Sequence, residues 1–132
     1  MLNNKKFSIA FFGWMLFVAW ASLSTFSKDD TPDFDIPNMD KLVHFCFYFG
    51  AAILGTFFIR ERFQKTFSLA KALVYAVVMA VSFGILMEIL QHNFTSDRQG
   101  DIFDALANTC GAIVGAVAIK CYFSNKRGLK WK

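Results

Sequence analysis

Polar residues suited to acid–base or ligand chemistry recur at helical spacing within three apolar stretches. Asp40 and His44 are four residues apart, where the first of these three stretches begins. Glu88 lies near the end of the second, and Asp104 and Asn108 are four residues apart in the third. Because residues four apart lie on one face of a helix, the spacing predicts a polar face on each helix. A carboxylate and an imidazole on adjoining faces can transfer protons or bind a metal ion.

Glu88 and His44 are the candidate acid–base pair. Glu88 lies near the carboxyl end of its predicted helix, where the helix dipole disfavours an anion, so helix capping does not explain it. A partly buried carboxyl group suits general acid or base catalysis, and His44 is its natural proton-transfer partner. The other candidates predict a substrate-binding surface that comprises Asp40, Lys41, Tyr48, Gln91, Arg98, Asp104 and Asn108.

Some of these residues also have a structural interpretation. Asp40 and Asp101 stand where predicted helices begin, so each carboxylate can cap the backbone N–H groups of a helix N-terminus. Asp104 can be a first-turn acid favoured by the helix dipole, and Asn108 can hydrogen-bond to a neighbouring helix. The sequence leaves these alternatives open.

A metal site is a further alternative. Two carboxylates and two imidazoles occur at four-residue spacing on two predicted helices, as Asp40, His44, Glu88 and His92. Such pairs are common by chance, so we predict no cofactor and no metal ligand and keep a divalent ion as the alternative. The cysteines have neither zinc-finger nor disulfide spacing, and we interpret them as packing residues: Cys46, Cys110 and Cys121.

The elements that must position these side chains are four long apolar segments. They cover residues 7–26, 42–59, 72–90 and 102–123, and each approaches the roughly 20 residues that a helix needs to cross a bilayer. The chain is 55% hydrophobic and 18% charged, which is more apolar than a soluble core of 132 residues can hide. The segments lack the alternation of barrel strands. We therefore predict an all-α fold, a bundle of four transmembrane helices in a single domain over residues 1–132.

The charges between the segments predict the orientation. Residues 28–41 include five Asp and two Lys, whereas residues 60–71 include four basic residues and one Glu. Lys5 and Lys6 precede the first segment, and the chain after the last segment is basic. Basic segments remain in the cytoplasm, so both termini are predicted to be cytoplasmic and the polar residues to form a cup at the extracytoplasmic side. The net charge of +4 is then a topology signal, and we expect no nucleic-acid partner.

The first segment has an alternative interpretation as a cleaved signal peptide over residues 1–21. Lys5 and Lys6 precede an apolar run that ends in a small-x-small sequence, as a signal peptide would. The run is long for a signal peptide, however, and Trp20 is typical of an interfacial anchor. We expect the segment to be retained, and the remaining topology is the same in either case.

Small residues continue the polar faces toward the opposite side of the membrane. Ala51 and Gly55 follow on the second segment, and Gly111 and Gly115 form a G-x-x-x-G pair on the fourth. Such pairs allow close helix packing. The inner halves of the segments contain no acidic residue and no His, which disfavours a proton or ion pathway across the membrane.

These residues, in this order, resemble the VanZ-like family of small bacterial membrane proteins. The pattern that carries the resemblance falls on Asp40, Lys41, His44, Tyr48, Glu88, Gln91, Arg98, Asp104, Asn108, Gly111 and Gly115, whereas His92 is outside it. The resemblance implies a multi-pass protein of the bacterial cytoplasmic membrane with a role in the cell envelope. The family takes its name from a protein that confers resistance to the glycopeptide teicoplanin, so a contribution to such resistance is also implied.

Three functional hypotheses remain at the sequence level. The first is an enzyme that acts on an amphiphilic envelope substrate at the outer leaflet, and the second is a binding protein for a lipid-linked envelope precursor or a glycopeptide. The third is a structural or interaction protein whose polar residues serve as interhelical hydrogen-bonding glue. The lipid bilayer is the expected partner of all three, and the oligomeric state and the sign of the ligand charge stay open.

Overall fold

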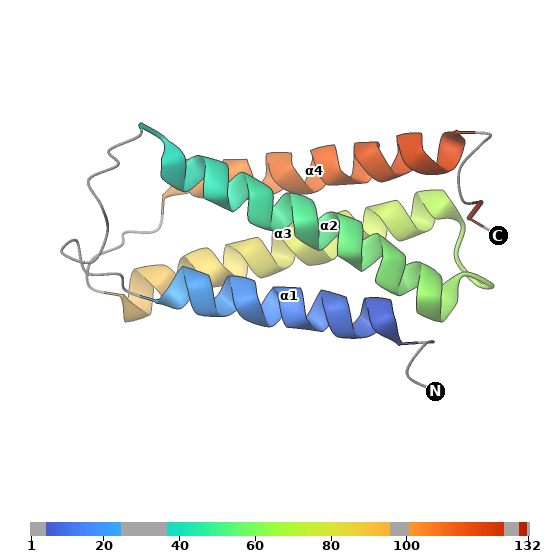
Figure 1. Ribbon diagram of the computed structural model, residues 1–132. Helices are drawn as coiled ribbons and strands as arrows, with labels where there is room; N and C mark the ends of the chain where they lie inside the picture. Colours follow the sequence, from blue (N-terminus) through green and yellow to red (C-terminus); the bar gives the residue numbers. More distant parts are fainter. Residues whose placement is uncertain (1–4, 25–36, 96–100, 126–129, 132) are drawn as a thin grey trace.

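The computed structural model describes residues 5–24, 37–95, 101–125 and 130–131, and it is built from four helices (Figure 1). These are α1 (Lys6–Leu23), α2 (Met39–Phe63), α3 (Leu69–Phe94) and α4 (Ile102–Ser124). All four are long and apolar enough to cross a membrane. The prediction of an all-helical protein with four such helices is confirmed.

The helices form an antiparallel bundle in which α2 packs against all three of the others and most extensively against α4. The start of α1 and the described end of the chain lie at the same end of the bundle (Figure 1). The start of α2, the end of α3 and the start of α4 meet at the opposite end. This topology brings the three predicted polar faces together, and we call that region the polar end.

The helices α2 and α3 extend beyond the predicted segments. The segment 42–59 lies within Met39–Phe63, and the segment 72–90 lies within Leu69–Phe94. Hydropathy marks the apolar part of a helix, whereas the backbone hydrogen bonds continue into the charged turns at either side. The last two residues of the predicted segment 7–26 lie outside the described residues.

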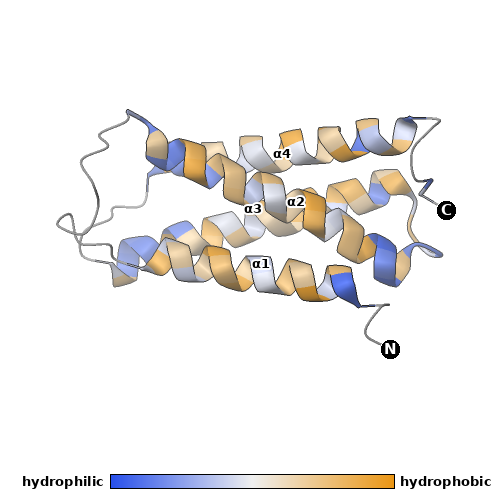
Figure 2. Ribbon diagram, viewed as in Figure 1, coloured by the Kyte–Doolittle hydropathy of each residue, from blue (hydrophilic) through white to orange (hydrophobic). Residues whose placement is uncertain are grey.

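The inner faces of the bundle are made of small residues. Ala51, Ala52, Ala80 and Ala112 are all at most 2% exposed, so the helix backbones approach closely. Large apolar side chains point outward instead, and Leu16 is 72% exposed. Figure 2 shows hydrophobic residues along all four helices, with hydrophilic ones concentrated at their ends. An apolar exterior around a small-residue interior is suited to a lipid environment.

The helix α1 is held at both of its ends by polar contacts. Glu61 of α2 accepts hydrogen bonds from the backbone nitrogens of Phe7 and Ser8, at 3.2 and 2.8 Å, and from the Ser8 hydroxyl at 2.6 Å. Near its other end, Gln91 of α3 donates a 2.6 Å hydrogen bond to the carbonyl of Ser22. The first apolar segment is therefore an integral part of this bundle.

Residues 130 and 131 pack on the bundle at the end opposite the polar end. We call this region, which includes the start of α1 and the last turn of α2 with Arg60 and Arg62, the basic end. Trp131 is 8% exposed, and its indole nitrogen donates a 2.9 Å hydrogen bond to the carbonyl of Phe67. Arg60 donates to the carbonyls of Trp131 and Lys130 at 3.3 and 3.0 Å. Trp131 is thus buried against the bundle.

Candidate functional site

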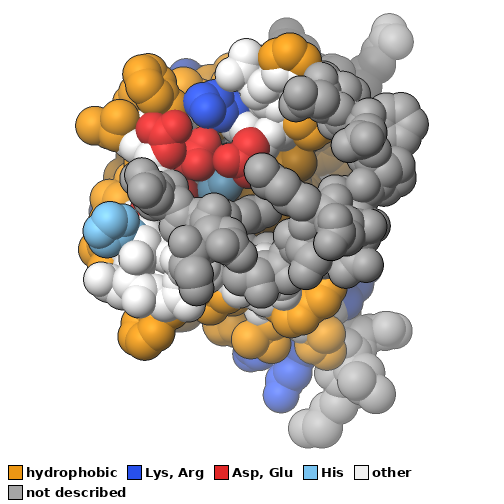
Figure 3. Space-filling model, turned by 90° about the vertical axis from the view of Figure 1, so that its left-hand side faces the viewer, with side chains coloured by type: hydrophobic (Ala, Val, Ile, Leu, Met, Phe, Trp, Pro, Cys, Tyr) orange, Lys and Arg blue, Asp and Glu red, His pale blue; other side chains and the backbone are white. Residues whose placement is uncertain are grey.

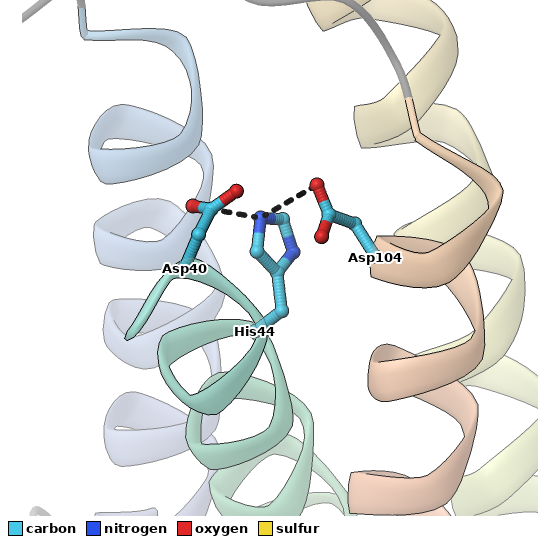
Figure 4. Close-up of side chains that lie close together, drawn as sticks. All are labelled: Asp40, His44 and Asp104. Atoms are coloured by element: carbon cyan, nitrogen blue, oxygen red, sulfur yellow. Dashed lines mark ion pairs between the residues drawn. The ribbon is translucent and has the colours of Figure 1, made fainter. Parts of the chain in front are cut away.

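Asp40, His44 and Asp104 converge at the polar end. Nε2 of His44 lies 3.8 Å from Oδ1 of Asp40, one helical turn earlier on α2, and 3.9 Å from Oδ2 of Asp104 on α4 (Figure 4). His44 and Asp104 are 5% and 6% exposed, whereas the Asp40 side chain is 56% exposed. In the space-filling view, acidic side chains gather around a histidine at this end (Figure 3). The group is therefore open to solvent on one side and enclosed on the other.

The two aspartates that precede helices have different local roles. Asp101 is the N-cap of α4, and its carboxylate accepts a 2.9 Å hydrogen bond from the backbone nitrogen of Phe103. The N-cap of α2 is Asn38, which has a left-handed backbone conformation with φ 62°, and Asp40 lies inside the first turn. The capping interpretation is thus confirmed for Asp101 and wrong for Asp40. The carboxylate of Asp40 faces His44 instead.

Asn108 connects His44 to Glu88 within the bundle. Its side-chain oxygen lies 3.0 Å from Nδ1 of His44, and its amide nitrogen donates a 3.4 Å hydrogen bond to Oε1 of Glu88. Oε1 of Glu88 is 3.6 Å from Nδ1 of His44. A histidine, an amide and a carboxylate from three helices thus form one buried chain, which includes both predicted acid–base groups.

Three buried polar atoms in this region have no hydrogen-bond partner among the described residues. They are the hydroxyl oxygen of Tyr48, Oε2 of Glu88 and Oδ1 of Asp104. Tyr48 is 1% exposed, lies one helical turn after His44 on α2, and has its ring beside Gly84 of α3. Buried polar groups are almost always paired, so unpartnered ones concentrated in one place indicate a functional site.

Lys41 contributes a positive charge at the rim. Its ammonium nitrogen lies 3.7 Å from Asp101 and 3.8 Å from Oδ1 of Asp104, and its side chain is 36% exposed. Exposed ion pairs at this distance contribute little to stability. Lys41 is thus available to interact with an anionic group of a ligand.

A pocket of about 260 Å³ opens between α3 and α4 beside the buried chain. Its wall includes Glu88, so this residue belongs to the buried chain and also lines a cavity. The other lining residues are Ile89, His92, Asn93, Asp101, Ile102 and Ala105. The mixture of apolar and polar walls is suited to an amphiphilic ligand.

The remaining predicted site residues lie elsewhere. Gln91 is buried against α1 through its bond to Ser22, and it does not join the polar group around His44. Arg98 lies outside the described residues. His92 is exposed at the pocket wall, and the acidic and histidine side chains that lie close enough to share a metal ion are Asp40, His44 and Asp104. Of the four residues in the metal alternative, Asp40 and His44 thus belong to this group, whereas Glu88 and His92 do not.

The predicted packing residues divide into two groups. A Cβ atom on Gly111 would collide with the backbone carbonyl of Phe45, and one on Gly115 would lie 2.7 Å from the carbonyl of Phe49. The cysteines, Cys46, Cys110 and Cys121, are all exposed. Their side chains do not pack inside the bundle, so the interpretation of the cysteines as packing residues is wrong.

The pocket wall around Glu88 was not predicted from the sequence. Ile89 and Asn93 line the pocket from α3, and Ile102 and Ala105 line it from α4. The spacing signal was present, because each pair is separated by about one helical turn. Isolated apolar residues in an apolar helix resemble lipid-facing positions, however, and only the pairing of α3 with α4 distinguishes them.

The arrangement supports two kinds of chemistry. A buried carboxyl group linked through an amide to an imidazole can transfer protons at a ligand that enters the pocket. The same groups can bind a polar head group by hydrogen bonds without any reaction. The three cysteines are exposed, so none of them is a candidate nucleophile for this site.

Comparison with known proteins gives one family. The family model described as VanZ/LLP1 matches residues 3–123, which is most of the chain. No curated protein and no solved structure matches.

Proposed function

Because the chain belongs to the VanZ/LLP1 family, we propose that it binds or acts on an amphiphilic component of the bacterial cell envelope. The family match extends over all four helices and includes every residue of the polar end. The proposal places the protein in the cytoplasmic membrane and its ligand at the outer leaflet. The ligand is a lipid-linked envelope precursor or a glycopeptide.

The proposed orientation puts the polar end on the extracytoplasmic side. Basic residues are concentrated at the opposite end, where Arg60 and Arg62 lie in the last turn of α2. The segment before α2 is acidic, with five Asp in residues 28–41. Since basic segments remain in the cytoplasm, both termini are cytoplasmic and the cup formed by Asp40, His44 and Asp104 faces outward.

The unpartnered oxygen of Glu88 is the observation that carries the proposal. Oε2 has no hydrogen-bond partner within 3.5 Å among the described residues, yet the residue is 9% exposed and lines the pocket. A carboxylate that served only as interhelical glue would have both oxygens bonded, because an unpaired buried polar group destabilises the fold. We assign this oxygen to a ligand, either as a hydrogen-bond acceptor or as an acid–base group.

The first experiment compares wild type with Glu88→Gln in a teicoplanin-sensitive Gram-positive host. The glutamine keeps the shape and removes the carboxylate, so we expect wild type to reduce susceptibility and the variant to lose most of that effect at equal membrane abundance. Glu61→Gln removes a carboxylate at the basic end and is the matched control. We expect its effect per folded molecule to equal that of wild type.

The outcomes separate the functional classes. Equal protection by wild type and Glu88→Gln would contradict a role for the carboxylate in this activity. Loss of folded Glu88→Gln from the membrane would favour the alternative, in which the polar residues are interhelical glue. If wild type gives no protection, a contribution to teicoplanin resistance is excluded, and ligand identification from native membranes tests the broader envelope role.

A further inference from the structure

Asn108 fixes the imidazole of His44 so that Nε2 faces two carboxylates. The amide nitrogen of Asn108 donates to Glu88, which directs the side-chain oxygen of Asn108 at Nδ1 of His44. An amide oxygen only accepts hydrogen bonds, so Nδ1 carries the proton. In the neutral ring, Nε2 then presents its lone pair to Asp40 and Asp104 (Figure 4).

The distances around Nε2 fit a metal ion better than a shared proton. Nε2 is 3.8 Å from Asp40 and 3.9 Å from Asp104, and ligand atoms of all three residues lie within 4.8 Å of one another. An N–H group hydrogen-bonds over ~2.7–3.2 Å, which is clearly shorter. Ligand atoms around a tetrahedral ion with bonds of ~2.1 Å lie roughly 3.4 Å apart. Small side-chain shifts therefore bring the three groups to coordination distance.

Asp104 gives an independent indication of a ligand. Its side chain is 8% exposed, and Oδ1 has no hydrogen-bond partner among the described residues. Lys41 lies 3.8 Å from this oxygen, which is too long for a hydrogen bond. A buried carboxylate oxygen without a hydrogen bond is costly, whereas coordination of a cation compensates its charge.

We propose that Asp40, His44 and Asp104 together bind a divalent transition-metal ion. The inference rests on the proposed function, because it assigns a cofactor to the same site. One imidazole and two carboxylates are ligands that Zn²⁺ accepts, whereas Mg²⁺ and Ca²⁺ favour oxygen atoms alone. The exposed carboxylate of Asp40 gives the ion a route from solvent.

A metal ion at this site would give the residues of the polar end different roles. His44 is a ligand, so Glu88 remains as the acid–base group of the pocket. Asn108 is a positioning residue, because it holds the proton on Nδ1 and turns Nε2 toward the ion. Three protein ligands leave a coordination position for water or for a polar group of the ligand.

Zinc binding by purified protein tests the inference. The protein is purified in detergent with a tag that lacks histidine, from a background in which Cys46, Cys110 and Cys121 are replaced by alanine. These thiols are exposed and would bind zinc themselves. We expect one zinc ion per chain after dialysis, a rise in thermal unfolding temperature with Zn²⁺, and a weaker response to Mg²⁺.

Three variants and one control locate the ion. Asn108→Ala removes a residue that orients His44, and it should reduce zinc affinity by about 10–100-fold. We expect Asp40→Asn and His44→Gln, which change ligands, to reduce zinc affinity at least as much. His92→Gln, which changes the other histidine, should bind zinc like the parent. Asp40 is exposed, so Asp40→Asn remains informative even where a buried variant fails to fold.

The outcomes keep the metal separate from the envelope function. Equal zinc affinity of the parent, Asp40→Asn and His44→Gln overturns the metal site, as does loss of zinc in His92→Gln. Tighter binding of Mg²⁺ than Zn²⁺ overturns the assignment to a transition metal. Zinc binding with no effect of Glu88→Gln on the envelope phenotype supports the metal site and contradicts the role proposed for the Glu88 carboxylate. If the parent protein binds no zinc but Glu88→Gln loses the envelope phenotype, the metal site is contradicted and the proposed function is supported.

Discussion

The two ends of the bundle differ in how completely a glutamate carboxylate is hydrogen-bonded. At the basic end, both oxygens of Glu61 accept hydrogen bonds from the first turn of α1, and Arg62 donates a 3.0 Å bond to the Ser8 hydroxyl in the same network. At the polar end, Glu88 is bonded by Asn108 on one oxygen, and its other oxygen has no partner among the described residues.

The difference separates structural from functional polar groups. A carboxylate that joins two helices has hydrogen-bond partners for both oxygens within the bundle, as Glu61 does. Such a residue can be explained without a ligand. A buried carboxylate with an unpaired oxygen beside a pocket destabilises the fold. It remains buried because the packing of the surrounding bundle compensates for that cost. The same residue type therefore has different roles, and the hydrogen-bond partners reveal which role applies.

The largest expected effect concerns the helix contact between the two ends. Gly111→Ala should lower the free energy of unfolding by about 1–3 kcal/mol or more, because the added Cβ atom collides with the backbone of Phe45. Gly13→Ala is the matched control, since a Cβ atom there meets nothing within 4 Å. Thermal unfolding in detergent measures both. Equal unfolding temperatures for the two variants would contradict the close approach of α2 and α4.

The next prediction compares the two carboxylates directly. Glu61→Gln should lose about 1–2 kcal/mol of stability, because the amide cannot accept all the hydrogen bonds that α1 donates. Glu88→Gln should stay within about 1 kcal/mol of wild type or be more stable, since an amide is less costly to bury than a carboxylate with an unused oxygen. Unfolding of both purified variants is the measurement, and a larger loss in Glu88→Gln would reverse our assignment of the two roles.

The smallest expected effect is at the lipid-facing surface. Replacement of Cys46, Cys110 and Cys121 by alanine should change stability by less than about 0.5 kcal/mol per site, because all three side chains are exposed. The unfolding temperature of the triple variant checks this expectation. A large loss would show that the thiols pack against other groups, and it would remove the thiol-free background from the zinc experiment.

The family match and the hydropathy of the segments agree on a multi-pass membrane protein. The polar faces were also predictable from spacing, because residues four apart share a helix face in any α-helix. His44 with Tyr48, and Asp104 with Asn108, are buried on the inner faces of α2 and α4 as this spacing predicts.

The contacts between helices were not predictable in the same way. Spacing placed Asp40 on the face of His44, but it could not show that α2 begins early enough for Asn38 to be its N-cap residue and for Asp40 to lie inside the first turn. The metal alternative included His92 because of its four-residue spacing from Glu88, whereas the rotation of α3 leaves His92 exposed. Glu61 and Trp131 gave no signal at all, since their partners are far away in the chain.

The sequence by itself determined the four apolar helices, their alternating charges and the presence of a polar face on each of three. These features depend on local composition and on the period of the helix, both of which are written along the chain. Tertiary structure alone decided that Asp104 rather than His92 joins Asp40 and His44, and that Glu88 keeps an unpartnered oxygen. The relative height and rotation of the helices follow from backbone contacts such as Gly111 against Phe45, and no single helix contains that information.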